Sequence, residues 1–267
     1  MLAVALPRSR VLLPTQLQHL SEHRYVVIKD WLSVAQVAEL QKDATAVDEY
    51  GSTRDSHIGN GQIGSATLDP SIRKSRQCSL IPPPSNAAGS THTRARLIHV
   101  VNGLRQQLQA STTLGLPHLE PFQTELSYVI YPVGGHYKRH LDTKYESSGW
   151  KLQGRKACDG GSFCGGRTRR VISFILYLNS GWDDANGGEL RVFPAFERDP
   201  GTRNGQCERF TEDIVPEGGT LVLLMSTDVE HLVRVTRAKR QCVVGWFREY
   251  REERVPDLDQ MSLRTPL

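Results

Sequence analysis

The spacing of hydrophobic residues changes about halfway along the chain. In the first half they recur every three or four residues, which places them on one face of a helix. Two such faces are formed by Val37, Leu40, Ala44 and Val47 and by Leu97, Val100, Val101, Leu104 and Leu108. Ser33 and Gln36 have the spacing of a capping box ahead of the first face. The sequence therefore predicts a helix that begins after Ser33 and a second helix over residues 93–109.

In the second half the apolar residues form short runs that have the length of strands. Residues 171–178 and 220–225 are almost continuously apolar, as expected of strands that are covered on both faces. Two Gly-Gly pairs, at 187–188 and 218–219, each precede a strand and suit turns with positive φ. With a further short strand over residues 25–29, the pattern indicates a mainly β fold supported by N-terminal helices.

A chain of 267 residues can bury one substantial core, and barrels of this size are commonly single domains. Within one domain we expect N-terminal support over residues 1–122, a β core over 123–249 and a polar tail over 250–267. The glycine-rich stretch 143–169 is predicted to be a long loop inserted into the core. Its Cys158 and Cys164 are interpreted as free or redox-active thiols, with a zinc site as the alternative.

Composition bounds the location and the partners of the protein. The five cysteines are an odd number at irregular spacing, which argues against a disulfide framework and favours a reducing compartment. No apolar run is long enough to span a bilayer, and the start MLAVALPRSRVLLP lacks the layout of a secretory signal. We therefore expect a cytoplasmic protein without a membrane partner, with organelle targeting as the alternative. A net charge of +4, without a basic stripe interleaved with aromatic residues, disfavours a nucleic-acid partner.

The triplet His140-Leu141-Asp142 carries the first candidate chemistry. On an extended segment, residues two apart place their side chains on the same side of the strand. A third imidazole from another strand, for which His231 is the candidate, would complete a set of two histidines and one carboxylate. That set leaves open positions on a metal and is the arrangement of non-haem Fe(II) oxygenases. Arg240 adds a planar cation whose shape suits the carboxylate of a dicarboxylic co-substrate.

The triplet alone has low specificity, and the sequence around it adds to the signal. Four blocks follow one another: YPVGGHYKRHLDT, RRVISFILYLNSGWDDANGGELRVF, VPEGGTLVLL and EHLVRVTRAKRQCVVGWFRE. Over roughly residues 123–249 these blocks resemble the Fe(II)/2-oxoglutarate dioxygenases, in particular the prolyl 4-hydroxylase branch that includes the hypoxia-factor prolyl hydroxylases. The resemblance implies a double-stranded β-helix, the jelly-roll or cupin-like barrel, with supporting N-terminal helices.

The resemblance also implies roles for individual residues. The residues that match the iron ligands of the family are His140, Asp142 and His231. The residues that match its co-substrate pocket are Arg240 and Tyr177, on the outer carboxylate of 2-oxoglutarate, and Tyr131 and Tyr137, which line the pocket. We interpret Trp182 and Trp246 as packing residues of the barrel. His136 is interpreted either as a residue at the solvent side of the site or as one that supports its ligands.

The function implied by the resemblance is hydroxylation of a C–H bond, with Fe(II), 2-oxoglutarate and dioxygen, and with ascorbate as reductant. Peptidyl proline is the favoured target, so the expected partner is a protein or peptide. The alternatives are a free amino acid, a small metabolite or another protein side chain. A barrel that binds without catalysis is a further hypothesis, disfavoured because all four of His140, Asp142, His231 and Arg240 are present.

Two surface segments carry hypotheses about the substrate. The segment 51–90 contains LDPSIRKSRQCSLIPP, which resembles the substrate-covering loop of prolyl hydroxylases, and Arg73 or Arg76 would be its substrate-contacting arginine. An ordinary flexible loop is the alternative. Residues 151–170 hold six basic residues against Asp159, which is either a solvated loop or a basic rim for an acidic protein substrate.

Overall fold

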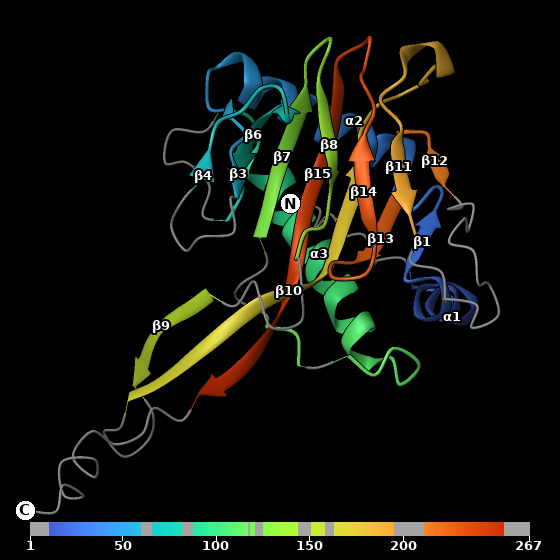
Figure 1. The fold of residues 1–267 in the computed structure, drawn as a ribbon. Helices are drawn as coiled ribbons and strands as arrows, with labels where there is room; N and C mark the ends of the chain where they lie inside the picture. Colours follow the sequence, from blue (N-terminus) through green and yellow to red (C-terminus); the bar gives the residue numbers. More distant parts are fainter. Residues whose placement is uncertain are drawn as a thin grey trace, which may run out of the picture.

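Two antiparallel sheets form the body of the protein (Figure 1). The computed structural model describes residues 11–59, 66–81, 88–116, 118–120, 125–143, 151–157, 163–194 and 211–253. The strands of the large sheet, in spatial order, are β1 (Tyr25–Ile28), β13 (Leu221–Met225), β10 (Phe163–Tyr177), β15 (Arg240–Glu253), β7 (Glu125–Tyr131), β6 (Arg76–Ser79) and β2 (Arg54–Asp55), with β9 (Lys151–Ala157) also paired to β10.

The small sheet carries two of the predicted metal ligands. Its strands, in spatial order, are β12 (Glu212–Ile214), β11 (Leu190–Phe193), β14 (Glu230–Val233), β8 (His136–His140) and β5 (Arg73–Lys74). A two-stranded ribbon of β3 (Ile58–Gly59) and β4 (Ala66–Thr67) and a short 3₁₀ helix η1 (Asp184–Asn186) complete the set. The predicted double-stranded β-helix, a mainly β barrel of two antiparallel sheets, is confirmed.

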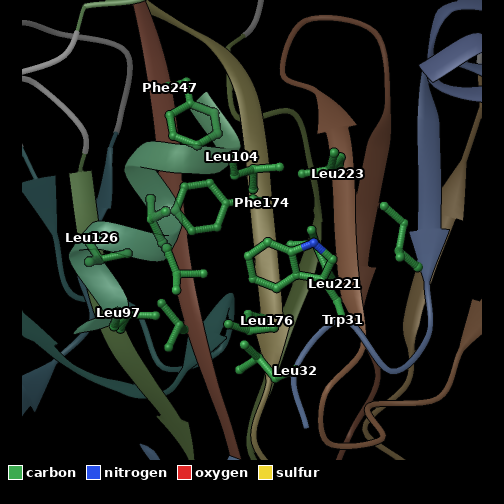
Figure 2. Packing of buried hydrophobic residues seen from close by; sticks show 14 of the residues in the cluster. Trp31, Leu32, Leu97, Leu104, Leu126, Phe174, Leu176, Leu221, Leu223 and Phe247 are labelled. Carbon is green, nitrogen blue, oxygen red and sulfur yellow. The ribbon is translucent and has the colours of Figure 1, made fainter. Parts of the chain in front are cut away.

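The central strands of the large sheet bury side chains on both faces. On β10, Phe174 and Leu176 belong to one buried cluster, while Ile175 and Tyr177 belong to another. Figure 2 shows the first cluster, where Phe174 lies beside Leu104 of a helix and Leu176 lies near Leu32. The second cluster includes Val192 of the small sheet and therefore lies between the two sheets. This double coverage explains the nearly continuous apolar runs in the sequence.

Three helices are present among the described residues: α1 (Pro14–His23), α2 (Val34–Glu49) and α3 (Thr91–Ala110). The two predicted helices, α2 and α3, are confirmed, and Ser33 Oγ accepts a hydrogen bond from Gln36 N at 3.3 Å as the capping box requires. Helix α1 was not predicted, because Leu20 is its one buried residue and so it shows little periodicity. None of the described helices is long and apolar enough to cross a membrane.

The prediction of a long loop over residues 143–169 is wrong for part of that stretch. Strand β9 and the first half of β10 pair with each other, and β10 continues along β15, as in the pair Arg167↔Arg251. These strands extend away from the barrel as an arm (Figure 1). Residues outside a core need no alternation of apolar and polar positions, so the sequence carried no strand signal there. Cys158 lies outside the described residues.

A buried ion pair joins α2 and α3 behind the large sheet. The carboxylate of Asp43 accepts hydrogen bonds from Arg94 Nε at 2.9 Å and from the Tyr128 hydroxyl at 2.8 Å. The Asp43 and Arg94 side chains are 1% and 5% exposed. Removal of one member of a buried pair leaves the other charge without compensation.

We therefore expect Asp43→Ala to lower the free energy of unfolding by about 3–5 kcal/mol in urea denaturation. The control is Glu39→Ala, which removes the partner of Arg96 on the same two helices, where the glutamate side chain is 49% exposed. Such a surface pair contributes less than about 1 kcal/mol. Equal losses in the two variants would contradict the assignment of Asp43 as a buried structural charge.

Candidate metal and co-substrate site

The two predicted histidine ligands lie opposite each other on adjacent strands. His140, the last residue of β8, is paired in register with His231 of β14. The Nδ1 of His140 donates to Lys138 O at 2.8 Å, and the Nδ1 of His231 donates to Val229 O at 3.1 Å. Because a carbonyl oxygen can only accept, both rings must carry their proton on Nδ1. Each ring therefore presents the lone pair of Nε2 to a metal.

Asp142 completes the set just beyond the end of β8. Its Oδ1 lies 3.6 Å from His140 Nε2, and its Oδ2 lies 3.7 Å from His231 Nε2. All three ligand atoms lie within 4.8 Å of one another, and no other such group is found among the described residues. The Ser173 hydroxyl, itself buried, donates to Asp142 Oδ2 at 2.6 Å and fixes that carboxylate. The three side chains thus form one face with converging donor atoms.

The surroundings of this face favour the protonation states that metal binding requires. Burial, together with the neighbouring His140, lowers the pKa of His231 to about 4, so this imidazole is neutral at physiological pH. Burial alone would raise the pKa of Asp142, but His231, His140 and Arg170 hold it well below the usual value. Imidazole nitrogens together with a carboxylate suit a first-row divalent metal such as Fe(II).

Arg240 lies fully buried at the start of β15, with 1% of its surface exposed. Its Nε donates to Gly188 O at 2.9 Å, and its Nη1 donates to Cys242 Sγ at 3.4 Å. The guanidinium carbon lies 4.8 Å from the ring centre of Tyr131 and 5.0 Å from that of Tyr177. The guanidinium is therefore fixed by two hydrogen bonds and packed against two aromatic rings.

Gly188 allows this close approach of the backbone to Arg240. It has a φ of +73°, which confirms the predicted positive-φ turn, and a Cβ at this position would lie 3.2 Å from Arg240 Cδ. A side chain here would strain the turn and crowd the arginine. The other predicted turn has positive φ at Gly219 only.

Two polar atoms of this pocket lack a partner among the described residues. They are Arg240 Nη2 and the hydroxyl of Tyr177, and both side chains are fully buried. Buried donors without acceptors are rare in folded proteins, and a catalytic role or a bound water or ion is among the explanations for them. A carboxylate fits both donors, because it offers two acceptor oxygens and the negative charge that the buried guanidinium lacks. The donor set of this pocket thus fits the distal carboxylate of 2-oxoglutarate.

Tyr131 and Tyr137 connect the two halves of the site. Tyr131 interacts electrostatically with both Arg240 and Asp142, and burial raises the pKa of its hydroxyl. Burial likewise raises the pKa of Tyr137 to about 12, and its ring stacks on His140 at 3.7 Å between ring centres. Both tyrosines therefore stay neutral at physiological pH and border the candidate metal and co-substrate positions.

An aromatic surface borders the metal face, and no motif in the sequence predicts it. Trp246 is paired across the sheet with Ser173, the residue that holds Asp142, so both side chains lie on the same face of the sheet. The Arg170 guanidinium lies 3.7 Å from the centre of the Trp246 ring and pairs with Glu125. Trp246 Nε1 has no partner among the described residues. Trp246 is half-buried next to Ser173, so the interpretation of Trp246 as a packing residue stays a prediction.

The other residues named from the sequence are outside the three-ligand group of His140, Asp142 and His231. Trp182 Nε1 donates to Gly187 O at 2.9 Å, as a packing residue would. His136 is half-buried and contacts Gly134 O and Ser71 O, at the side of β8. Arg76 pairs with Asp48 of α2 at 2.8 Å. Arg73 lies against the Tyr137 ring.

Comparisons with known proteins agree with this geometry. A prolyl-4-hydroxylase of Pseudomonas putida superposes with a TM-score of 0.63 at 23% identity, over 89% of this chain and 99% of that chain. A prolyl hydroxylase of Trichoplax adhaerens, in complex with a hypoxia inducible factor peptide fragment, gives 0.62 at 16% identity, over 94% and 91%. The epimerase SnoN, in complex with Fe³⁺, alpha ketoglutarate and nogalamycin RO, gives 0.53 at 12% identity, over 92% and 89%. At these identities the likeness shows the fold.

A family model also matches part of the sequence. Residues 126–248, which run from β7 to β15 and include the triad and Arg240, match the model of the 2OG-Fe(II) oxygenase superfamily. The similarity to this superfamily therefore covers the segment that holds the candidate site.

Proposed function

We propose that this protein is a 2-oxoglutarate-dependent dioxygenase that hydroxylates proline in a peptide or protein. The observation that carries the dioxygenase half of the proposal is the pair of unpartnered donors, Arg240 Nη2 and the Tyr177 hydroxyl, in a barrel that also holds the His140, Asp142 and His231 face. The bound iron and co-substrate would supply the oxidising chemistry, in which dioxygen converts 2-oxoglutarate to succinate and CO2 and adds a hydroxyl to the substrate.

The roles of the residues follow from their contacts. His140, Asp142 and His231 hold the metal by two imidazole nitrogens and a carboxylate oxygen, and the Ser173 hydroxyl fixes that carboxylate. Arg240 binds the distal carboxylate of 2-oxoglutarate. Because its charge is fully buried, the arginine strongly prefers an anionic ligand end to a neutral one.

A second group of residues completes the co-substrate pocket. Tyr177 donates its hydroxyl to the same distal carboxylate, and Tyr131 and Tyr137 enclose the space between Arg240 and Asp142. Enclosure by buried aromatic rings keeps water away from the reacting atoms.

The aromatic surface beside His140, Asp142 and His231 supports peptidyl proline as the substrate. Trp246, with Arg170 against its ring, offers an apolar surface for a pyrrolidine ring. Two of the similar structures are prolyl hydroxylases, one of them with a bound peptide fragment. A small-molecule substrate is the second candidate, since SnoN has the same fold and is described in complex with nogalamycin RO.

The test is succinate formation from 2-oxoglutarate with Fe(II) and ascorbate under air. We expect proline-containing peptides to stimulate the reaction and to gain one oxygen atom by mass spectrometry, and the same peptides with alanine in place of proline to do neither. Free L-proline is the small-molecule arm. Stimulation by free amino acids alone, or by no peptide while 2-oxoglutarate is bound, would contradict the peptidyl target and favour the second candidate.

A Trp246→Leu variant tests, in the same assay, whether Trp246 contributes to peptide binding and not to the metal centre. Loss of the aromatic surface is expected to raise the peptide KM several-fold, by about 1 kcal/mol or more of binding free energy. The peptide-independent succinate rate should keep its KM for 2-oxoglutarate. A change confined to the co-substrate KM would place Trp246 in the other pocket.

A further inference from the structure

We propose that Arg73, which lies outside the segment matched by the family model, is a positioning residue of the metal centre: it orients the ring of His140 through the ring of Tyr137. The proposal rests on the proposed role of His140 as a metal ligand. It concerns how the chain prepares that ligand, and it assigns no contact between Arg73 and the metal.

The inference starts from Tyr137, which contacts both of the other side chains. Its ring stacks on the His140 imidazole with 3.7 Å between ring centres and an interplanar angle of 23°. The guanidinium carbon of Arg73 lies 4.8 Å from the centre of the same ring. A cation at this distance from an aromatic ring is attracted by its π system and fixes its orientation. The orientation of the tyrosine in turn limits the rotation of the imidazole.

The Arg73 side chain is itself fixed from behind. Its Nε donates to Ser75 Oγ at 2.9 Å, and the Ser75 hydroxyl donates to Ser56 Oγ at 2.9 Å. Both serines are buried. A guanidinium held by a hydrogen bond to a buried group loses little further freedom when it contacts a ring.

The backbone of this segment places Arg73 beside the first metal ligand. Strand β5 pairs with β8 in the register Arg73↔Tyr137, and Lys138 N donates to Ile72 O at 2.8 Å. The chain then leaves the small sheet and continues as β6 in the large sheet. The buried Ser75 lies at this crossing, so the position of Arg73 is set by both sheets.

His140 is the ligand that needs such support. Its side chain is 18% exposed, whereas that of His231 is 6% exposed. The contact of Nδ1 with Lys138 O fixes the tautomer of His140. A ligand that is oriented before the metal arrives loses less entropy on binding, so the stack should raise metal affinity.

The described contacts of Arg73 are with Ser75, the His57 carbonyl, Gln77 and the Tyr137 ring, none of which is a carboxylate, so its replacement leaves no described acid without a partner. Arg73→Met keeps the length of the side chain and removes the charge and the planar group. Arg73→Lys keeps the charge without the plane. Lys74→Met is the matched control, because it removes a positive charge from the next residue of β5, which is exposed.

The measurement is the dissociation constant of Co(II), used as a coloured substitute for Fe(II), by calorimetric titration and by its visible absorption. We expect Arg73→Met to weaken Co(II) binding by about tenfold and to shift the absorption bands, the low end of the range for residues that orient metal ligands. Arg73→Lys should lie between Arg73→Met and the wild type, and Lys74→Met should match the wild type. In a Tyr137→Leu background, Arg73→Met should have no further effect.

Wild-type affinity and spectrum in a folded Arg73→Met protein would overturn the proposal, and so would full additivity with Tyr137→Leu. If Arg73→Met does not fold, unchanged Co(II) binding by Arg73→Lys would overturn it. The His140→Ala variant distinguishes failure of the metal assignment from failure of the positioning role of Arg73. If that variant binds Co(II) like the wild type, the metal assignment has failed, and with it the basis of this inference. If only the Arg73 variants bind normally, the metal assignment stands and the positioning role fails.

Discussion

Replacing His231 with alanine is expected to abolish succinate formation and to weaken Co(II) binding by more than about a hundredfold, because loss of a ligand should exceed the 10–100-fold typical for loss of a residue that supports one. His231 is 5% exposed, its Nδ1 is committed to Val229 O, and its Nε2 faces Asp142. No other described histidine, cysteine or acidic residue joins His140 and Asp142 in a three-ligand group. Calorimetric titration with Co(II) and a coupled assay for succinate are the two measurements.

The control for this prediction is His136→Ala. His136 is a second histidine on β8, half-buried, whose ring nitrogens contact the carbonyl oxygens of Gly134 and Ser71. It is absent from the three-ligand group. We expect this variant to bind Co(II) like the wild type. Turnover by His231→Ala at more than a few per cent of the wild-type rate would show that the metal is held elsewhere.

The residue types of the site could be predicted from sequence, but the contacts that prepare it could not. The H-x-D spacing and the strand run around it indicated His140 and Asp142, and the resemblance supplied His231. The register that sets His140 opposite His231 joins residues far apart in the chain. The hydrogen bond from Ser173 to Asp142 depends on the same kind of long-range placement. A serine within an apolar run carries no signal of such a contact.

The fold shows the same division between local and long-range information. The helix over residues 34–49 follows from Ser33, Gln36 and one apolar face, all of which are local. Strands such as β5 have two residues each and gain their stability from pairing with β8, so no period exists to detect. Arg73 was considered from sequence only as a substrate contact within a loop. Its position against Tyr137 follows from that pairing.

The co-substrate pocket illustrates why burial matters more than residue type. Arg240 and Tyr177 could be named from the resemblance, but many proteins contain arginine and tyrosine in strands. What distinguishes this pair is that both side chains are fully buried and that Arg240 Nη2 and the Tyr177 hydroxyl have no partner among the described residues. Such atoms cost free energy in the absence of a ligand, which the gain on ligand binding must offset.

Replacing Arg240 with methionine is therefore expected to separate stability from function. The variant loses the buried charge and the proposed charge-assisted contact of Nη2 with the co-substrate, and we expect the Kd of 2-oxoglutarate to rise about a hundredfold or more. The same change removes a buried cation that has no carboxylate partner among the described residues. Substitution of such charges by apolar residues of similar size is often neutral or stabilising. The melting temperature of the variant, measured without 2-oxoglutarate, should thus equal or exceed that of the wild type.

Two comparisons make this prediction specific. Tyr177→Phe removes a single neutral donor to the same carboxylate, and its effect on the Kd of 2-oxoglutarate should be about three- to tenfold. Co(II) binding without 2-oxoglutarate should be unchanged in Arg240→Met, because Arg240 contacts Gly188 and Cys242 and none of the triad. A 2-oxo acid of the same length that ends in a methyl group should bind the wild type poorly and should lose no affinity in Arg240→Met. Wild-type affinity of Arg240→Met for 2-oxoglutarate would mean that the distal carboxylate is bound by another residue, and the buried guanidinium would then be a structural cation.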